Sequence, residues 1–126
     1  MGNGADKELL AQEQELDDLL TLSIESWKFV RLFQRALAKL DPSEQTRFVG
    51  QIRFFQRRVD ALLETRGIRL ESLEGQVFEP GLAAAPLNAD EFPNSEQRLV
   101  VAQMIEPVVM GPNGVMRTGT FLLGAI

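Results

Sequence analysis

The chain has 126 residues, of which 44% are hydrophobic and 25% are charged, as in an ordinary single-domain globular protein. It contains no cysteine, histidine or tyrosine. Without cysteine it can form neither disulfides nor thiolate metal sites, and without histidine it lacks the commonest metal ligand and general base. We therefore expect no enzymatic activity, no cofactor and no metal, and a function that lies in shape and surface.

The net charge of −5 is unevenly distributed, because residues 1–20 and 71–126 are acidic and residues 21–70 are basic. The bases alternate with apolar positions and have acids within a helical turn, which is typical of a solvated helix face, so no nucleic acid partner is expected. No apolar run of about 18 residues occurs, and the N-terminus lacks a signal-peptide core. These features predict a cytoplasmic protein with no membrane partner.

The N-terminal half predicts a long helix. Residues 1–5 include two glycines and are expected to be disordered. No proline occurs over residues 6–40, which would form a helix of about 50 Å at about 1.5 Å per residue. Its apolar residues recur at steps of three or four: Leu16, Leu20, Ile24, Trp27, Val30, Phe33, Leu37 and Leu40. A stripe of this length needs a partner helix, from this chain or from another.

A second helix is predicted over residues 42–66. Asp41 is a good N-cap, Pro42 suits the first helical position, and Glu44 lies where a capping box has its acid. Gly67 can end the helix in left-handed geometry. The apolar stripe has the spacing of a coiled-coil seam: Phe48, Ile52, Phe55, Val59 and Leu62. The short connection favours an antiparallel hairpin, and a continuous helix kinked at Pro42 is the alternative.

Residues 6–66 are therefore predicted to form a helical dimerisation region, with a two-fold symmetric homodimer. Packing in a helix–helix seam is the expected role of Trp27. The positions predicted to form the seam are Leu16, Leu20, Trp27, Val30, Phe48, Ile52, Phe55 and Val59.

Residues 67–126 predict a small β-domain. Its elements are a short strand at residues 68–70, a turn at 75–80, a small apolar segment at 82–86, a polar loop at 87–97, and strands at 99–105, 108–110, 115–117 and 118–123. Asn113-Gly114 favours a hairpin turn, and Pro107 is expected at an edge or bulge. The predicted fold class is thus α+β, with a helical hairpin or long helix followed by a β-domain.

The order of these parts resembles the GrpE family, the nucleotide exchange factors of DnaK-type chaperones. Over residues 60–123 the resemblance lies in Leu63 with Gly67-Ile68, in Gly75-Gln76-Val77-Phe78-Glu79-Pro80, where Glu79 replaces the usual aspartate, and in Met116 to Leu123, which keeps Arg117. The resemblance implies a dimer paired through long helices. It also implies a β-domain that opens the nucleotide cleft of the chaperone's ATPase domain.

The partner-binding residues that follow from this resemblance lie on the predicted hairpin: Pro112, Asn113, Gly114, Met116 and Arg117. Arg117 is predicted to anchor on an acidic chaperone surface, and a local ion pair with Glu106 is the alternative. Three methionines could form a soft binding face or fill the core: Met104, Met110 and Met116. Phe78 is expected in the core, and Pro80 is expected to fix its turn.

Two other functions are open. The family's residues are replaced at Glu106-Pro107-Val108 and at Thr118-Gly119, which motivates an adaptor or structural protein that keeps the fold without exchange activity. An enzyme is a weaker interpretation, because the Asp and Glu residues show no paired spacing or cofactor motif.

Overall fold

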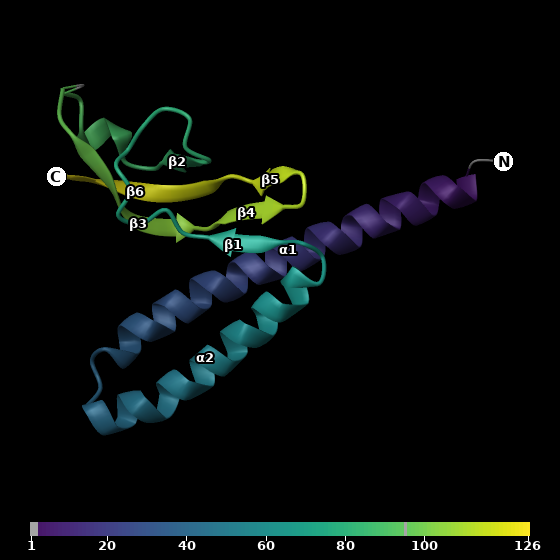
Figure 1. Ribbon diagram of the computed structural model, residues 1–126, viewed down its shortest axis with the longest axis horizontal. Helices are drawn as coiled ribbons and strands as arrows, with labels where there is room; N and C mark the ends of the chain where they lie inside the picture. The colour runs from purple at the N-terminus through teal and green to yellow at the C-terminus, as the bar shows by residue number, and fades with distance from the viewer. Residues whose placement is uncertain (1–2, 95) are drawn as a thin grey trace.

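The computed structural model describes residues 3–94 and 96–126, and this part of the chain has the predicted α+β layout (Figure 1). Two long helices come first, α1 (Asn3–Leu37) and α2 (Pro42–Glu64). Six strands follow in the described residues and form two small sheets. The β-domain lies along the middle of α1, and the N-terminal part of α1 extends beyond both α2 and the strands (Figure 1).

The first helix differs from the prediction at both ends. It begins at Asn3, so the prediction of a disordered segment is wrong for residues 3–5, while residues 1–2 lie outside the described part. A glycine costs a helix only about 1 kcal/mol, and a long helix gains one hydrogen bond for each added residue. At the other end α1 stops at Leu37 rather than Leu40, where 3.2 and 3.0 Å bonds from Lys39 and Leu40 reach back only three residues.

The hairpin alternative is the one observed, and Asp41 starts its second arm. The Asp41 carboxylate accepts hydrogen bonds from the backbone N–H groups of Ser43 and Glu44, at 3.1 and 3.2 Å, and Pro42 occupies the first turn of α2. The hydrogen bond from the Ser43 hydroxyl is the main cause that lowers the pKa of Asp41. Between the arms, Val30 and Leu37 are buried against Ile52, and Phe48 and Val49 pack around them.

The strands are short apart from two. Their bounds are β1 (Arg69–Glu71), β2 (Ala84–Pro86), β3 (Leu99–Glu106), β4 (Val108–Gly111), β5 (Gly114–Arg117) and β6 (Gly119–Ala125), with a 3-10 turn at Ala89–Glu91. One sheet has the order β1-β4-β5 and the other β2-β6-β3. All pairs are antiparallel except β2 with β6, which is parallel.

The two sheets are joined by two consecutive strand pairs, because β3 continues into β4 and β5 continues into β6. β3 leads into β4 through buried Pro107, and β5 leads into β6 through Thr118, so both pairs change sheet at the same level. A Cβ on Gly119 would lie 2.6 Å from the carbonyl oxygen of Glu106. Only glycine permits this close approach. Pro107, which was predicted at an edge or bulge, lies between β3 and β4, and the nearest shift of the β3–β6 register is between Met104 and Glu106.

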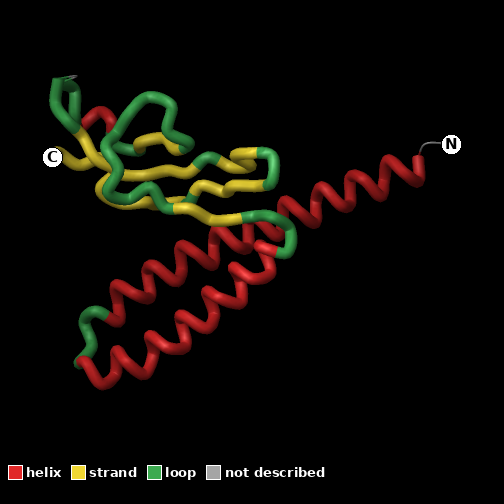
Figure 2. Tube along the Cα trace, viewed as in Figure 1, coloured by secondary structure: helices red, strands yellow, loops and turns green. Residues whose placement is uncertain are grey.

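Two apolar clusters join the strands to the helices, and the strand layer lies over the helices in Figure 2. The first cluster consists of Val101, Met104, Val108, Phe121 and Leu123, with Trp27 of α1 packed against it. The second consists of Leu20 from α1, Leu63 from α2, and Ile68 and Val109 from the β-domain. Because the second cluster draws on all three parts, the β-domain and the hairpin form one packed unit.

Gly67 gives a test of this junction. Its φ is +70°, and a Cβ there would lie 2.8 Å from Cγ of Pro112. We expect Gly67→Ala to lower the free energy of unfolding by about 1–3 kcal/mol, through backbone strain and displacement of the hairpin tip. Gly50 lies inside α2, and a Cβ there would meet nothing within 4 Å, so Gly50→Ala should raise stability by about 0.5–1 kcal/mol. Urea denaturation followed by circular dichroism measures both, and equal effects of the two substitutions would refute this account.

Candidate functional site

The β4–β5 hairpin tip is exposed but firmly supported. Gly114 has a φ of +120°, which closes the turn, and Pro112 and Asn113 are exposed at its end. Pro112 rests on Gly67, at the junction between α2 and β1. The predicted partner-binding tip of the β4–β5 hairpin is therefore supported by the end of α2 and is not a free loop.

Met116 faces the core rather than solvent. It is half-buried, packs against the cluster of Leu20 and Leu63, and covers Gly111, where a Cβ would lie 2.5 Å from its sulfur. This side chain therefore offers little surface to a partner. The neighbouring Val115 is 47% exposed and was missed by the sequence reasoning. The alternation of strand side chains would have identified it, because residues next to one another point to opposite faces.

The other two methionines that were considered for a binding face, Met104 and Met110, also fill the core. Met104 is 1% exposed, and Met110 packs against the same cluster. Phe78 packs there too, with its ring 5.9 Å from that of Phe121. Core filling is thus the observed role of these side chains.

Arg117 forms an ion pair with Asp17 of α1, and the predicted pair with Glu106 is wrong. The strand register explains the difference. Arg117 lies opposite Val109 in the β4–β5 ladder, whereas Glu106 lies opposite Thr120 and accepts a 3.1 Å hydrogen bond from its hydroxyl. The Arg117 side chain remains 37% exposed beside the hairpin tip. Its guanidinium is therefore accessible to a partner while it links the β-domain to α1.

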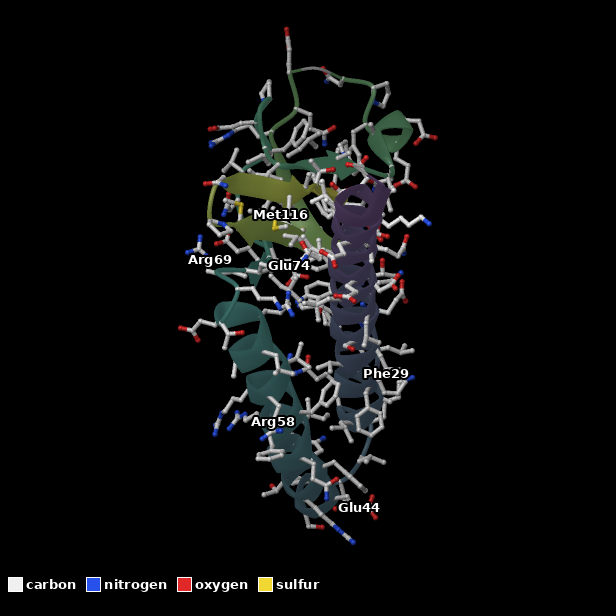
Figure 3. The ribbon with its side chains drawn as sticks, turned by 90° about the vertical axis from the view of Figure 1, so that its right-hand side faces the viewer. Phe29, Glu44, Arg58, Arg69, Glu74 and Met116 are labelled. Carbon is white, nitrogen blue, oxygen red and sulfur yellow. The ribbon has the colours of Figure 1, made fainter. Side chains whose placement is uncertain are left out.

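A second ion pair joins the same two parts. Arg31 of α1 pairs with Glu74, which also accepts a 2.9 Å hydrogen bond from the backbone N–H of Met104. Glu74 lies between the strands and α1 (Figure 3). The Arg31 guanidinium also stacks 4.6 Å from the ring centre of Trp27, and its Nε–H finds no acceptor among the described residues. These contacts fix the direction of the Arg31 side chain.

Trp27 departs from its predicted role in a helix–helix seam. Its ring packs against the β-domain cluster that includes Met104 and Phe121. The helical stripe has two neighbours, and Trp27 packs against the strand cluster while it also borders Val59 of α2. Sequence periodicity alone gives the direction of a side chain on a helix but not which element covers it.

A groove of about 410 Å³ runs between α1 and β3. We call it the α1–β3 groove. Its apolar part is formed by Trp27, Phe29, Leu32, Met104 and Ile105. Its charged part is formed by Lys28, Arg31 and Arg35, with Glu25 at one end. Lys28 pairs with Glu25 at 3.4 Å, whereas Arg35 takes part in none of the ion pairs found in the described part of the chain. Apolar and basic side chains thus line the groove together, and we call the row of Lys28, Arg31 and Arg35 its basic rim.

A second cavity of about 510 Å³ lies at the far end of the β-domain. Mostly apolar side chains line it, among them Phe78, Phe92 and Leu99, with Arg98 at its edge. Glu96 and Arg98 are the charged residues among the described ones that line it.

The predicted dimer seam is largely covered within one chain. Leu20, Val30 and Ile52 are buried, and the partly buried members of the set pack around them or around the strands: Leu16, Trp27, Phe48 and Val59. Phe55, at 45% exposed, is the member of the predicted set that presents its ring to solvent. The seam spacing is the same whether the partner helix belongs to this chain or to another, so the sequence could not separate the two.

A different apolar strip is exposed on the hairpin. We call it the outer apolar face, and it consists of Leu22, Phe29 and Phe33 on α1 and Phe55 and Leu62 on α2. Phe29 and Phe33 stack with centroids 6.2 Å apart, and Phe33 meets Phe48 of α2 edge-on at 6.4 Å. The second contact joins α1 to α2 next to this strip. Phe29 is visible on α1 in Figure 3.

The described residues hold no group of three or more His, Cys, Asp or Glu side chains that could bind a metal ion. Within the same part of the chain, neither helix combines the length and apolarity needed to span a membrane. Comparison with protein-family models, with curated proteins and with solved structures gave no match. The surfaces just described therefore carry the functional argument.

The two ion pairs between α1 and the β-domain should differ in strength. We expect a double-mutant cycle on Arg31 and Glu74 to give a coupling on the order of 1–2 kcal/mol, because this pair is partly buried and shares a backbone N–H. The more exposed pair of Asp17 and Arg117 should give about 0–1 kcal/mol. Chemical denaturation of the single and double alanine variants measures both couplings. A larger coupling for the exposed pair would contradict this ranking.

Proposed function

We propose that the protein is a GrpE-like co-chaperone that binds the ATPase domain of a DnaK-type chaperone and promotes ADP release. The order of parts supports this, since a helical hairpin is followed by a compact β-domain, as the resemblance in residues 60–123 implies. The observation that carries the proposal is the placement of Arg117. The family's arginine stands beside an exposed, supported hairpin tip, with its guanidinium partly open to solvent.

The proposed contact is electrostatic and rigid. Arg117 offers a forked donor to an acidic surface, and Pro112 and Asn113 offer an exposed tip that needs little ordering on binding. Val115 adds an exposed apolar side chain on the same hairpin. A partner held in its open-cleft form by these contacts would release nucleotide faster, because binding shifts a conformational equilibrium by its differential affinity for the two states.

The pair between Asp17 and Arg117 does not oppose this role. Both side chains are partly exposed, so the pair contributes only about 0–1 kcal/mol and gives way readily to a better-placed partner carboxylate. In the free protein the pair holds the guanidinium in one region beside the tip.

We further propose that the protein acts as a homodimer through the outer apolar face. This face holds exposed aromatic rings on both helices of the hairpin, and exposed apolar patches commonly mark interfaces. Pairing two hairpins across it would form a four-helix arrangement around Phe29 and Phe55.

The adaptor hypothesis remains the second candidate. The observation that favours it is the sheet crossing at Pro107 and Gly119, where the chain departs from the family's residues and the backbone packs tightly. An adaptor would bind the chaperone without changing its nucleotide release.

The exchange reaction tests the proposal directly. The protein is mixed with a DnaK-type chaperone preloaded with fluorescent ADP, and release is followed by stopped flow. We expect accelerated release, and we expect Arg117→Ala to reduce the acceleration by about tenfold, as for loss of an interface arginine. Binding without acceleration would favour the adaptor, and the absence of any binding would refute both.

Asp17→Asn is the matched control for this experiment. It breaks the same intramolecular ion pair as Arg117→Ala but keeps the arginine. If Arg117 acts on the partner, Asp17→Asn should retain full acceleration. Equal losses in both variants would show that the ion pair matters only for the position of the β-domain.

The dimer is tested by analytical ultracentrifugation. We expect the protein to sediment as a dimer at micromolar concentration, and Phe29→Glu or Phe55→Glu to sediment as a monomer, because each places a charge in the middle of the apolar interface. Leu87→Glu, at an exposed apolar residue of the β-domain, should remain dimeric. Dimers that persist in both phenylalanine variants would exclude the outer apolar face.

A further inference from the structure

We propose that the α1–β3 groove is a docking site for an extended acidic peptide segment that carries apolar side chains. This site is separate from the hairpin tip and does not depend on the exchange activity, and it shares Phe29 with the outer apolar face. Three properties of the groove support the proposal: its charges, its walls and its prearranged side chains.

The charges of the groove favour an acidic ligand. Lys28, Arg31 and Arg35 follow one another at steps of three and four along α1, so they form a row along the rim. Glu25 offsets part of the Lys28 charge at 3.4 Å, and Glu74 offsets part of the Arg31 charge. Arg35 has no such neighbour among the ion pairs of the described residues. The rim therefore carries excess positive charge in a protein whose net charge is −5.

The walls favour an extended chain. One wall is a helix and the other is strand β3, which contributes Gln103, Met104 and Ile105. In an extended peptide alternate side chains point in opposite directions. Apolar side chains can then enter the groove beside Leu32 and Ile105 while carboxylates meet the basic rim.

Arg31 is held ready for such a ligand. Its guanidinium is fixed by Glu74 and by stacking on Trp27, so little side-chain entropy is lost when an acidic group arrives. A neighbouring cavity of about 270 Å³ continues the surface from Arg31 and Arg35 to Gln34 and Ala38. The hollowed surface thus extends along another turn of α1 and remains bordered by Arg31 and Arg35.

The groove contains its own reporter, because Trp27 is the single tryptophan of the chain and lies on its wall. The probe is the fluorescein-labelled heptapeptide Glu-Leu-Asp-Leu-Glu-Leu-Asp, and the control peptide replaces its acids by Gln and Asn. We expect the acidic peptide to raise fluorescence anisotropy, its unlabelled form to change Trp27 emission, and added salt to weaken both. The amide peptide should bind on the order of tenfold more weakly.

Arg35→Glu should lower the affinity for the acidic peptide on the order of tenfold while leaving the circular dichroism spectrum and melting temperature unchanged. Arg58→Glu makes the same charge change on α2, where Arg58 does not line the groove (Figure 3), and it should bind like the unchanged protein. Ile105→Ser tests the apolar wall and should weaken both peptides alike.

Three results would overturn the proposal. The first is no binding of the acidic peptide, and the second is equal weakening by Arg35→Glu and Arg58→Glu, which would indicate non-specific attraction. The third is a groove that ignores this peptide but binds a synthetic peptide of residues 6–18, the acidic part of α1. That result would assign the groove to a second copy of the chain.

Discussion

The packing of α1 against two neighbours at once is the constraint on which the rest of the structure depends. Val30 and Leu37 face α2, Trp27 packs against the strands, and Leu20 packs in the cluster where both neighbours meet. A helix has room for two such stripes because its side chains repeat every 3.6 residues. The same helix carries exposed Phe29 and, where it borders β3, the basic rim of the groove, so the surfaces available to partners are positioned by the helix that forms the core.

The helices and the hairpin turn could be predicted from the sequence because their signals are local. Asp41 and Pro42 marked the start of α2, and Asn113-Gly114 marked the β4–β5 turn. β2 could not be predicted in the same way. Its residues Ala84–Pro86 have no strand pattern, and they become a strand only because β6, formed by residues far along the chain, lies beside them in parallel register.

The candidate site was predicted only in part, since its residue types are local but its contacts are not. Arg117 was identified, but its partner Asp17 lies 100 residues away in the sequence, and no pattern near Arg117 points to it. The apolar stripe of α1 was likewise correct in position, while its neighbours were assigned by the fold. The spacing of apolar residues at steps of three and four defines one face of a helix. It does not determine which element, or which copy of the chain, covers that face.

The folded structure explains part of the uneven charge distribution, in which acidic segments flank the basic residues 21–70. Solvation of helix faces explains part of it, and two ion pairs join segments that are far apart in the sequence. Arg31 of the basic middle meets Glu74 of the acidic β-domain, and Arg117, a base within that acidic domain, meets Asp17 of the acidic N-terminal segment. Such pairs add little to stability, yet they favour one docking of the domain on α1 over others, because displaced arrangements bring like charges together. The bases left over, Arg35 foremost, lie where α1 borders β3. Docking of the β-domain thus uses part of the basic charge of α1 and concentrates the remainder at one groove.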